Sequence, residues 1–446
     1  MTHTLSVIGT GYLGAVHAAC MTQMGHTVVA VDTDADKVAG LAAGRAPLFE
    51  PGLDELLAAT LATGRLTFTT DVSAVADCDV HFICVGTPQR RGEYAADTRY
   101  VFAALEAIAP HLRAGSLVVG KSTVPVGTAH ALTELLRELT GRRLAGAAAR
   151  LAWNPEFLRE GFAIKDTMSP DRLVYGVEGD AKEADIALLD EVYAVPLAAG
   201  TPRLVVDLPT AELVKVAANA FLATKISFIN AMAEVCEAAG ADVVHLADAI
   251  GMDDRIGRKF LGAGIGFGGG CLPKDIRAFM ARAGELGADQ ALTFLREVDA
   301  INDRRRVRMV DMAREQCGGT LRHKRVAVLG AAFKPDSDDV RNSPALDIAA
   351  AAQQAGATVV IHDPKAIPAA RLARPTLTYA EAVEDALTGA DVVLHLTEWS
   401  DYRDLDPARL TALVASPSII DGRNSLDPAV WRAAGWVYRA LGRPHA

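Results

Sequence analysis

A short apolar strand that runs into a glycine-rich turn constrains the fold of this chain more than any other feature. Residues 5–8 read Leu-Ser-Val-Ile, residues 9–14 read Gly-Thr-Gly-Tyr-Leu-Gly, and a second predicted strand at 27–31 ends at Asp32. Such glycines allow a tight turn and let a pyrophosphate rest on a helix N-terminus, while the acid takes the adenosine ribose hydroxyls. The pattern predicts NAD in preference to NADP. A purely structural turn is the alternative.

The loops after later strands are expected to join this cofactor site, because parallel sheets of this kind bind ligands at the carboxyl ends of their strands. The residues expected at the cofactor are Gly9, Gly11, Tyr12, Leu13, Gly14, Asp32, Lys37, Thr87, Pro88 and Thr123.

Strands alternate with helices at both ends of the chain, which predicts parallel sheets covered on both faces. Further strands are expected at 79–85, 116–119, 325–330, 358–363 and 390–396, and an uninterrupted helix from 210 to about 239. We therefore expect an α/β fold of two Rossmann-like, doubly wound domains joined by a long central helix. The expected division is 1–207 for the dinucleotide-binding domain, 208–305 for a helical and dimerisation domain, and 306–446 for a second Rossmann-like domain. The second turn, at 330–334, lacks the later glycines and is expected to bind something other than a dinucleotide.

Composition excludes several classes of protein. The chain has 446 residues, 50% of them hydrophobic, and a net charge of −10, which argues against a general nucleic-acid binder. Its six cysteines are scattered without a CxxC pair, so neither a disulfide framework nor a metal site is expected. No apolar run of about 18 residues is present, so we expect a cytoplasmic protein without a membrane partner.

Residues 266–275 read Gly-Phe-Gly-Gly-Gly-Cys-Leu-Pro-Lys-Asp. Glycines allow close approach of a ligand or of another segment, and Pro273 suits the first turn of a helix. A thiol at a helix N-terminus is favoured as the thiolate, so Cys271 is a candidate nucleophile. A small apolar cysteine in a turn is the alternative.

Lys215 and Asn219 are one helical turn apart on the expected central helix. Together they can donate hydrogen bonds to an oxygen that becomes an alkoxide. A solvated surface pair is the alternative, although the neighbouring residues are apolar.

Seven motifs stand in the order found in nucleotide-sugar dehydrogenases, and the chain resembles that family (the UDP-glucose/GDP-mannose dehydrogenases) over nearly its whole length. Residues 255–261, followed by the cysteine loop, are most similar to the members that oxidise UDP-glucose to UDP-glucuronate. The motifs are residues 9–14, 49–53, 121–128, 154–161, 212–219, 266–275 and 333–341.

The resemblance implies a four-electron oxidation that uses two NAD per substrate. It implies that Cys271 captures the aldehyde as a thiohemiacetal and then carries a thioester, and that Lys215 and Asn219 stabilise the oxyanion. Thr123 and Asp275 would hold a water that takes the alcohol proton, and Glu156 would assist hydrolysis. A loop acid facing solvent is the alternative for Glu156 and Glu160.

The resemblance also implies the ligand contacts. Arg341 and Glu160 are expected near the cofactor, Lys334 on the UDP-sugar, and Arg255 in the site of a partner subunit, which implies a homodimer. The chain has Gly262-Ala263-Gly264 where many members have Pro-Gly. The residues expected at the substrate are Glu156, Phe157, Leu158, Glu160, Lys215, Asn219, Arg255, Phe260, Leu261, Gly264, Gly268, Lys334 and Arg423.

Other functions remain open at this point. A dehydrogenase of GDP-mannose or of a UDP-N-acetylhexosamine would share these motifs. A two-electron hydroxyacid dehydrogenase would have no use for Cys271, and a non-catalytic nucleotide-sugar binder would have no reason to carry Cys271, Lys215 and Asp275 together.

Overall fold

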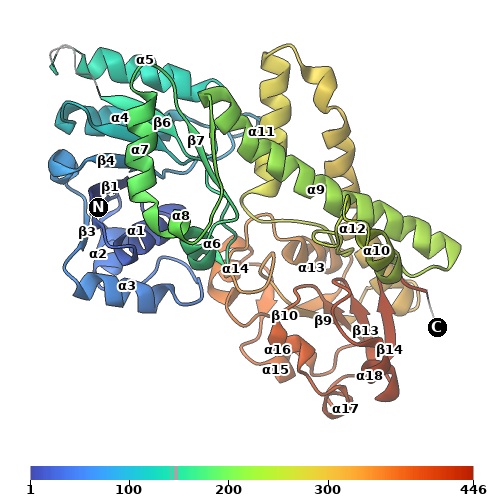
Figure 1. Ribbon diagram of the computed structural model, residues 1–446. Coiled ribbons are helices and arrows are strands. Elements are labelled where there is room, and N and C mark those ends of the chain that lie inside the picture. The colour runs from blue at the N-terminus through green and yellow to red at the C-terminus, as the bar shows by residue number, and fades with distance from the viewer. Residues whose placement is uncertain (1, 142, 145–148, 445–446) are drawn as a thin grey trace. The chain divides into compact units, whose positions relative to one another are not determined.

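The computed structural model describes residues 2–141, 143–144 and 149–444. They form two compact units (Figure 1). Unit 1 comprises residues 1–218 and 277–287, and unit 2 comprises 219–276 and 288–446. The helices α9 (Leu208–Ala239) and α11 (Leu272–Glu285) each begin in one unit and end in the other. The three-domain division expected from the sequence stays a prediction.

Unit 1 is built on an eight-stranded sheet with the order β3-β2-β1-β4-β5-β6-β7-β8. Neighbouring strands are parallel except β6 and β7, which meet antiparallel at Trp153 and Gly176. The strands are β1 Thr4–Ile8, β2 Thr27–Val31, β3 Leu66–Thr69, β4 Val80–Ile83, β5 Leu117–Gly120, β6 Arg150–Trp153, β7 Leu173–Gly176 and β8 Arg203–Val206.

Helices cover both faces of this sheet, because successive side chains of a buried strand point to opposite faces. In β5, Leu117 and Val119 enter one apolar core, while Val118 enters the other. The expectation of a doubly wound unit is thus confirmed. The helices are α1 Tyr12–Gln23, α2 Ala35–Ala42, α3 Leu53–Ala62, α4 Arg99–Ile108, α5 Thr128–Thr140, α6 Ala163–Met168, α7 Lys182–Val192 and α8 Ala194–Ala198, with 3₁₀ turns at Val72–Asp77 and Ala109–His111.

Unit 2 contains a six-stranded parallel sheet with the order β11-β10-β9-β12-β13-β14. Its strands are β9 Arg325–Leu329, β10 Thr358–His362, β11 Thr378–Tyr379, β12 Val392–His395, β13 Ser418–Asp421 and β14 Val437–Ala440. Its helices are α10 Val243–Gly251, α12 Phe294–Gln316, α13 Pro344–Gln354, α14 Ile367–Ala373, α15 Val383–Leu387, α16 Ser400–Arg403, α17 Pro407–Leu410 and α18 Pro428–Ala433, with a 3₁₀ turn at Asp289–Leu292.

The long central helix predicted at 210–239 is α9, Leu208–Ala239. By length and composition α9 could cross a membrane, but 44% of its most apolar window is buried inside the protein. Core helices of soluble proteins meet the same criteria. We therefore assign α9 no membrane role.

Candidate functional site

The glycine-rich turn of unit 1 has the shape that a pyrophosphate requires. Gly9 has φ of +90°, and a Cβ at Gly14 would lie 1.8 Å from the Gly9 carbonyl oxygen, so neither position accepts a side chain. A Cβ at Gly11 would meet nothing within 4 Å. Gly9 and Gly14 therefore allow the turn itself, whereas Gly11 leaves open space beside the first turn of α1. These residues fit the phosphates of NAD.

Asp32 follows β2 and is held as a carboxylate. Its Oδ2 accepts hydrogen bonds from the Thr10 backbone N–H at 2.7 Å and from the Lys37 ammonium at 3.0 Å. Partial burial opposes ionisation, but the hydrogen bonds from Thr10 and Asp34 and the charge of Lys37 together lower the pKa of Asp32. An ionised acid at this place fits a ribose diol and repels a 2′-phosphate.

The loops after β4 and β5 are tied together beside the turn. The Thr87 hydroxyl donates to the Thr123 carbonyl at 2.6 Å, and Pro88 is exposed with its carbonyl accepting from Asp97 at 2.7 Å. The Thr87 bond fixes the backbone of Thr123.

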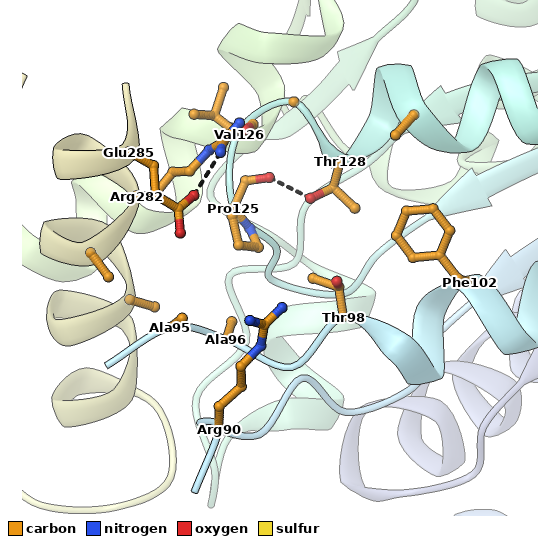
Figure 2. A pocket seen from close by; sticks show the side chains of 14 residues that line it. Arg90, Ala95, Ala96, Thr98, Phe102, Pro125, Val126, Thr128, Arg282 and Glu285 are labelled. Carbon is orange, nitrogen blue, oxygen red and sulfur yellow. Dashed lines mark hydrogen bonds and ion pairs between the residues drawn. The ribbon is translucent and has the colours of Figure 1, made fainter. Parts of the chain in front are cut away.

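A cavity of about 250 Å³ lies behind the same loop (Figure 2). Pro125 and Val126 line it from the β5 loop, and Arg282 lines it from the end of α11. The Arg282 Nε donates to the Val126 carbonyl at 2.9 Å, and the Thr128 hydroxyl donates to the Pro125 carbonyl. None of the residues predicted for the site lines this cavity. The hydrogen bonds of Arg282 and Thr128 beside the cavity hold the loop that carries Thr123.

Glu156 and Lys215 form an ion pair in unit 1. Glu156 Oε1 lies 3.0 Å from the Lys215 ammonium, and Glu156 Oε2 accepts from the Leu158 backbone N–H at 2.8 Å. Lys215 is buried and lies 5.8 Å from the centre of the Phe157 ring. The structure thus brings together a base and a cation that the sequence placed in different motifs.

Asn219, Asp275 and Lys274 form a second cluster, in unit 2. The Asn219 amide donates to Asp275 Oδ2 at 2.6 Å, and the Lys274 ammonium lies 2.7 Å from Asp275 Oδ1. Asp275 is almost fully buried, so both partners compensate a charge that is costly to bury alone. The sequence motif contained Lys274, but no role was predicted for it.

Cys271 is exposed and immediately precedes the first residue of α11. Its carbonyl accepts from the Asp275 N–H at 2.9 Å, which begins the helical hydrogen-bond pattern. The expected helix start is confirmed, and the thiol lies at the positive end of a helix of 14 residues.

The glycines of this loop face other segments of unit 2. A Cβ at Gly268 would lie 2.3 Å from the Asn342 carbonyl, one at Gly269 2.8 Å from the Phe333 ring, and one at Gly270 2.4 Å from Arg341 Cζ. Of the two possibilities raised by the sequence, close approach of another chain segment is thus the one observed at these positions.

Lys334 and Arg341 lie in the loop after β9, and Arg423 contacts that loop from the segment after β13. Arg341 pairs with Asp339, with Nη2 2.7 Å from Oδ2. Lys334 lies 5.5 Å from the centre of the Phe333 ring. The guanidinium of Arg423 donates to three carbonyl oxygens, of Leu396 at 2.8 Å, Gly266 at 2.9 Å and Phe333 at 3.1 Å. Arg423 therefore fixes the glycine loop, and its contact with a nucleotide stays a prediction.

The remaining predicted substrate residues, and Leu13 from the predicted cofactor site, differ in how far their side chains are exposed. Leu261 is buried in the core beside α9 and α10, so only its backbone could reach a ligand, and Leu13 and Leu158 pack on the core of unit 1. Phe260 has φ of 65° and is exposed, a backbone strain that is common at binding sites. Arg255 is 89% exposed and pairs with Asp253.

Two buried charges near the predicted residues had no role assigned from the sequence. Lys121 is buried after β5 and donates to Asn154 Oδ1 at 2.9 Å, and burial lowers its pKa to about 8. Glu50 is buried and contacts Tyr12 and the loop that follows Glu156. Lys121 belongs to the motif at residues 121–128 and Glu50 to the motif at residues 49–53. Membership of these motifs was the sequence signal that could have pointed to a role for each residue.

Known proteins resemble the chain along its whole length. Three family profiles match it, all of the UDP-glucose/GDP-mannose dehydrogenase family: the NAD binding domain at residues 3–196, the central domain at 209–304 and the UDP binding domain at 327–428. A UDP-glucose 6-dehydrogenase of Rhizobium meliloti is 42% identical over 442 residues, covering 99% of each chain. One of Pseudomonas aeruginosa is 40% identical, covering 99% of this chain and 98% of the relative.

Solved structures of nucleotide-sugar dehydrogenases share this fold over nearly the whole chain. A UDP-glucose dehydrogenase from Pyrobaculum islandicum superimposes with a TM-score of 0.88 at 39% identity, covering 99% of this chain and 98% of the other. A UDP-D-ManNAc dehydrogenase from Pyrococcus horikoshii superimposes with a TM-score of 0.85 at 26% identity, covering 99% and 100%.

Proposed function

Because the chain belongs to the UDP-glucose/GDP-mannose dehydrogenase family, we propose that it oxidises the C6 alcohol of UDP-glucose to the carboxylate of UDP-glucuronate. The observation that carries the proposal is the exposed thiol of Cys271 at the start of α11, in a chain 42% identical over its full length to a UDP-glucose 6-dehydrogenase. A two-electron alcohol oxidation would need no nucleophile there.

Unit 1 is the cofactor side of this reaction. The turn of Gly9, Gly11 and Gly14 would hold NAD, which would supply the hydride acceptor for each of two oxidations. Asp32 orients the adenosine ribose, and Thr123, fixed by Thr87, faces the loop edge of the sheet.

Cys271 is the covalent catalyst in the proposed reaction. Its thiolate adds to the aldehyde carbon and gives a thiohemiacetal, whose oxidation leaves a thioester. Water then attacks the thioester carbon, the carbon–sulfur bond breaks, and UDP-glucuronate and the thiolate are released. The positive end of α11 favours the thiolate in both the attacking and the leaving role.

Lys215 and Asn219 are proposed to stabilise the oxyanions. They are one turn apart on α9, and each is held by a carboxylate, Glu156 or Asp275. Glu156 is proposed to assist the hydrolytic water, and the placement of a water by Thr123 and Asp275 remains a prediction.

The homodimer expected from the family remains a proposal, with α9 as its supporting element. Phe221, Phe228 and Val235 are seven residues apart and 66%, 48% and 57% exposed. Apolar residues repeated at this spacing form one stripe of a helix, and such a stripe is typical of helix–helix association. The nearby Arg255 would then be available to the site of a partner subunit.

A dehydrogenase of another nucleotide sugar is the second candidate. The Pyrococcus horikoshii enzyme for UDP-D-ManNAc has nearly the same fold, but its identity to this chain is 26%, against 42% for the Rhizobium meliloti enzyme. UDP-glucose is therefore preferred. A cytoplasmic location is proposed from the six dispersed cysteines, none of which forms a disulfide within the described residues.

Product stoichiometry tests the proposal. Purified protein is incubated with limiting UDP-glucose and excess NAD, and NADH and UDP-glucuronate are measured. We expect two NADH per UDP-glucuronate. One NADH per sugar would contradict the four-electron mechanism, and a preference for GDP-mannose or UDP-N-acetylmannosamine in a parallel panel would replace the substrate.

A further inference from the structure

Glu50 is a buried carboxylate in unit 1, within the motif at residues 49–53, to which the sequence assigned no role. It is 5% exposed and lies in the segment between α2 and α3. Its Oε2 accepts from the Tyr12 hydroxyl at 2.5 Å and from the Gly161 backbone N–H at 2.6 Å, and its Oε1 accepts from the Ala163 N–H at 2.7 Å. These three hydrogen bonds lead to two other chain segments, the start of α1 and residues 161–163.

The two segments that Glu50 joins contact different ligands in the proposed function, NAD for the start of α1 and the UDP-sugar for the loop of residues 156–161. Tyr12 is the first residue of α1 and directly follows Gly11, where the turn leaves open space. Gly161 closes the loop that begins with Glu156, whose carboxylate pairs with Lys215. One carboxylate oxygen thus contacts both the cofactor turn and the end of the substrate loop.

The electrostatics keep this connection in one form. Burial, followed by the hydrogen bond to Glu50, raises the pKa of Tyr12, so the phenol remains a donor throughout the physiological range. The charges of Glu50 and, to a smaller extent, Glu160 raise the same pKa. A charged acceptor also makes these hydrogen bonds stronger than neutral ones.

We propose that Glu50 is a positioning residue that couples cofactor binding to the conformation of the substrate loop. Cofactor beside Gly11 fixes Tyr12, Tyr12 fixes Glu50, and Glu50 holds the loop of residues 156–161 in its binding conformation. The inference rests on the proposed function, in which the cofactor must be exchanged once while the sugar remains attached to Cys271. Such a link lets each incoming cofactor restore the same loop.

The test measures thermodynamic coupling without turnover. UDP-glucose is titrated calorimetrically into the protein alone and into the protein saturated with NADH, which cannot oxidise it. We expect NADH to tighten UDP-glucose binding at least about 5-fold in the unaltered protein. Glu50→Gln retains the size of the side chain but places an N–H donor of its amide against a backbone N–H donor. We expect the ratio of UDP-glucose affinities with and without NADH to fall close to 1 in this variant.

Two further variants make the test decisive. Tyr12→Phe removes only the hydroxyl and is expected to lose the coupling as well, and the double variant should lose no more than Glu50→Gln alone. Asp185→Asn, at another buried carboxylate of unit 1 that pairs with Arg150 at 3.0 Å, should leave the ratio unchanged.

Each outcome decides the matter. No coupling in the unaltered protein, or full coupling in either Glu50→Gln or Tyr12→Phe, overturns the inference. Equal loss in Asp185→Asn would reduce Glu50 to a general structural role and would also overturn it. Failure to bind UDP-glucose in every form refutes the proposed function instead, and the two failures are therefore distinguishable.

Discussion

In the sequence, the sheets of unit 1 and unit 2 both begin with a strand, a turn and a second parallel strand that ends beside an aspartate (β1 and β2, β9 and β10), yet the two aspartates have different partners. Asp32 is partly exposed and shares its Oδ2 between Thr10 and Lys37. Asp363 is 2% exposed, and its oxygens accept from the backbone N–H groups of Ala331 and Ala332 and from the indole of Trp399. The carboxylate of Asp363 thus accepts hydrogen bonds from within its own domain, whereas the carboxylate of Asp32 is accessible to a ribose.

The turns differ in the same direction. In unit 1, Gly11 leaves space, while in unit 2 the corresponding stretch carries Ala331 and Ala332, both fully buried. A Cβ at Gly330 would lie 2.3 Å from the Thr397 hydroxyl oxygen, so the second turn is packed against its own domain. One sheet topology thus supports a ligand-binding turn and a closed turn, and the side chains decide which is formed.

The largest expected effect separates the chemistry of unit 2 from the cofactor site of unit 1. Cys271→Ala should lower net UDP-glucuronate formation at least about 10⁴-fold, because no thioester can form. Binding of NADH and UDP-glucose should stay within a few-fold, since the thiol is exposed. Rapid-quench product analysis and calorimetry measure the two quantities. Near-normal release of UDP-glucuronate would rule out the covalent mechanism.

The glycines of the first turn can be separated by a pair of substitutions. Gly14→Ala places a Cβ against the Gly9 carbonyl and should destabilise unit 1 by about 3–5 kcal/mol. Gly11→Ala should leave the free energy of unfolding nearly unchanged but weaken NADH binding, because its methyl group enters the space for the pyrophosphate. Denaturant unfolding and NADH titration are the measurements. Equal NADH affinity in Gly11→Ala would place the pyrophosphate elsewhere.

The two aspartates should respond in opposite ways. Asp363→Asn should destabilise unit 2 by about 2–3 kcal/mol, since an amide cannot accept all the hydrogen bonds of the buried carboxylate. It should not alter the affinity for NADH. Asp32→Asn should cost little stability and should narrow the preference of NAD over NADP. Hydrogen exchange resolved by peptide, together with coenzyme kinetics, distinguishes the two. An effect of Asp363→Asn on coenzyme preference would contradict the assigned difference.

The smallest expected effect is a difference in acid sensitivity. Burial lowers the pKa of His81 in β4 to about 4, so the folded state stays neutral while the unfolded chain binds a proton below about pH 6.5. The contribution of His81 to the free energy of unfolding is therefore lost as the pH falls from 6.5 towards 4. This loss is about 2 kcal/mol between pH 7 and 5. In β12 of unit 2, His395 instead lies 2.9 Å from Asp421.

Hydrogen exchange at pH 7 and 5 tests this difference between the units. Peptides of unit 1 should lose protection before those of unit 2, and His81→Gln should reduce the loss but not abolish it, because burial also lowers the pKa of His17 in unit 1. Burial opposes ionisation of Asp421, but His395 and backbone hydrogen bonds lower its pKa, so its contribution is lost only below about pH 4. Earlier opening of unit 2 at pH 5 would contradict the assignment.

The strands β1, β2, β4, β5, β9, β10 and β12 and the first turn were predicted, because their signals are local. The apolar runs placed β2 at Thr27–Val31 and α9 within two residues of its observed start. The antiparallel contact of β6 with β7 was not foreseen, since a single pairing depends on how the chain returns to the sheet. The role of Lys274 beside Asp275 also escaped prediction, because two adjacent opposite charges give no sign of burial.

The sequence by itself determined the cofactor turn, the acid at Asp32, the thiol before a helix, and the order of motifs that identifies the family, because each depends on residues close together in the chain. The tertiary structure alone decided the partners of three carboxylates: Lys215 for Glu156, Asn219 for Asp275, and Tyr12 and Gly161 for Glu50. These partners are far apart in the sequence. Burial makes an uncompensated charge costly, so the fold brings to each a partner that no local pattern could specify.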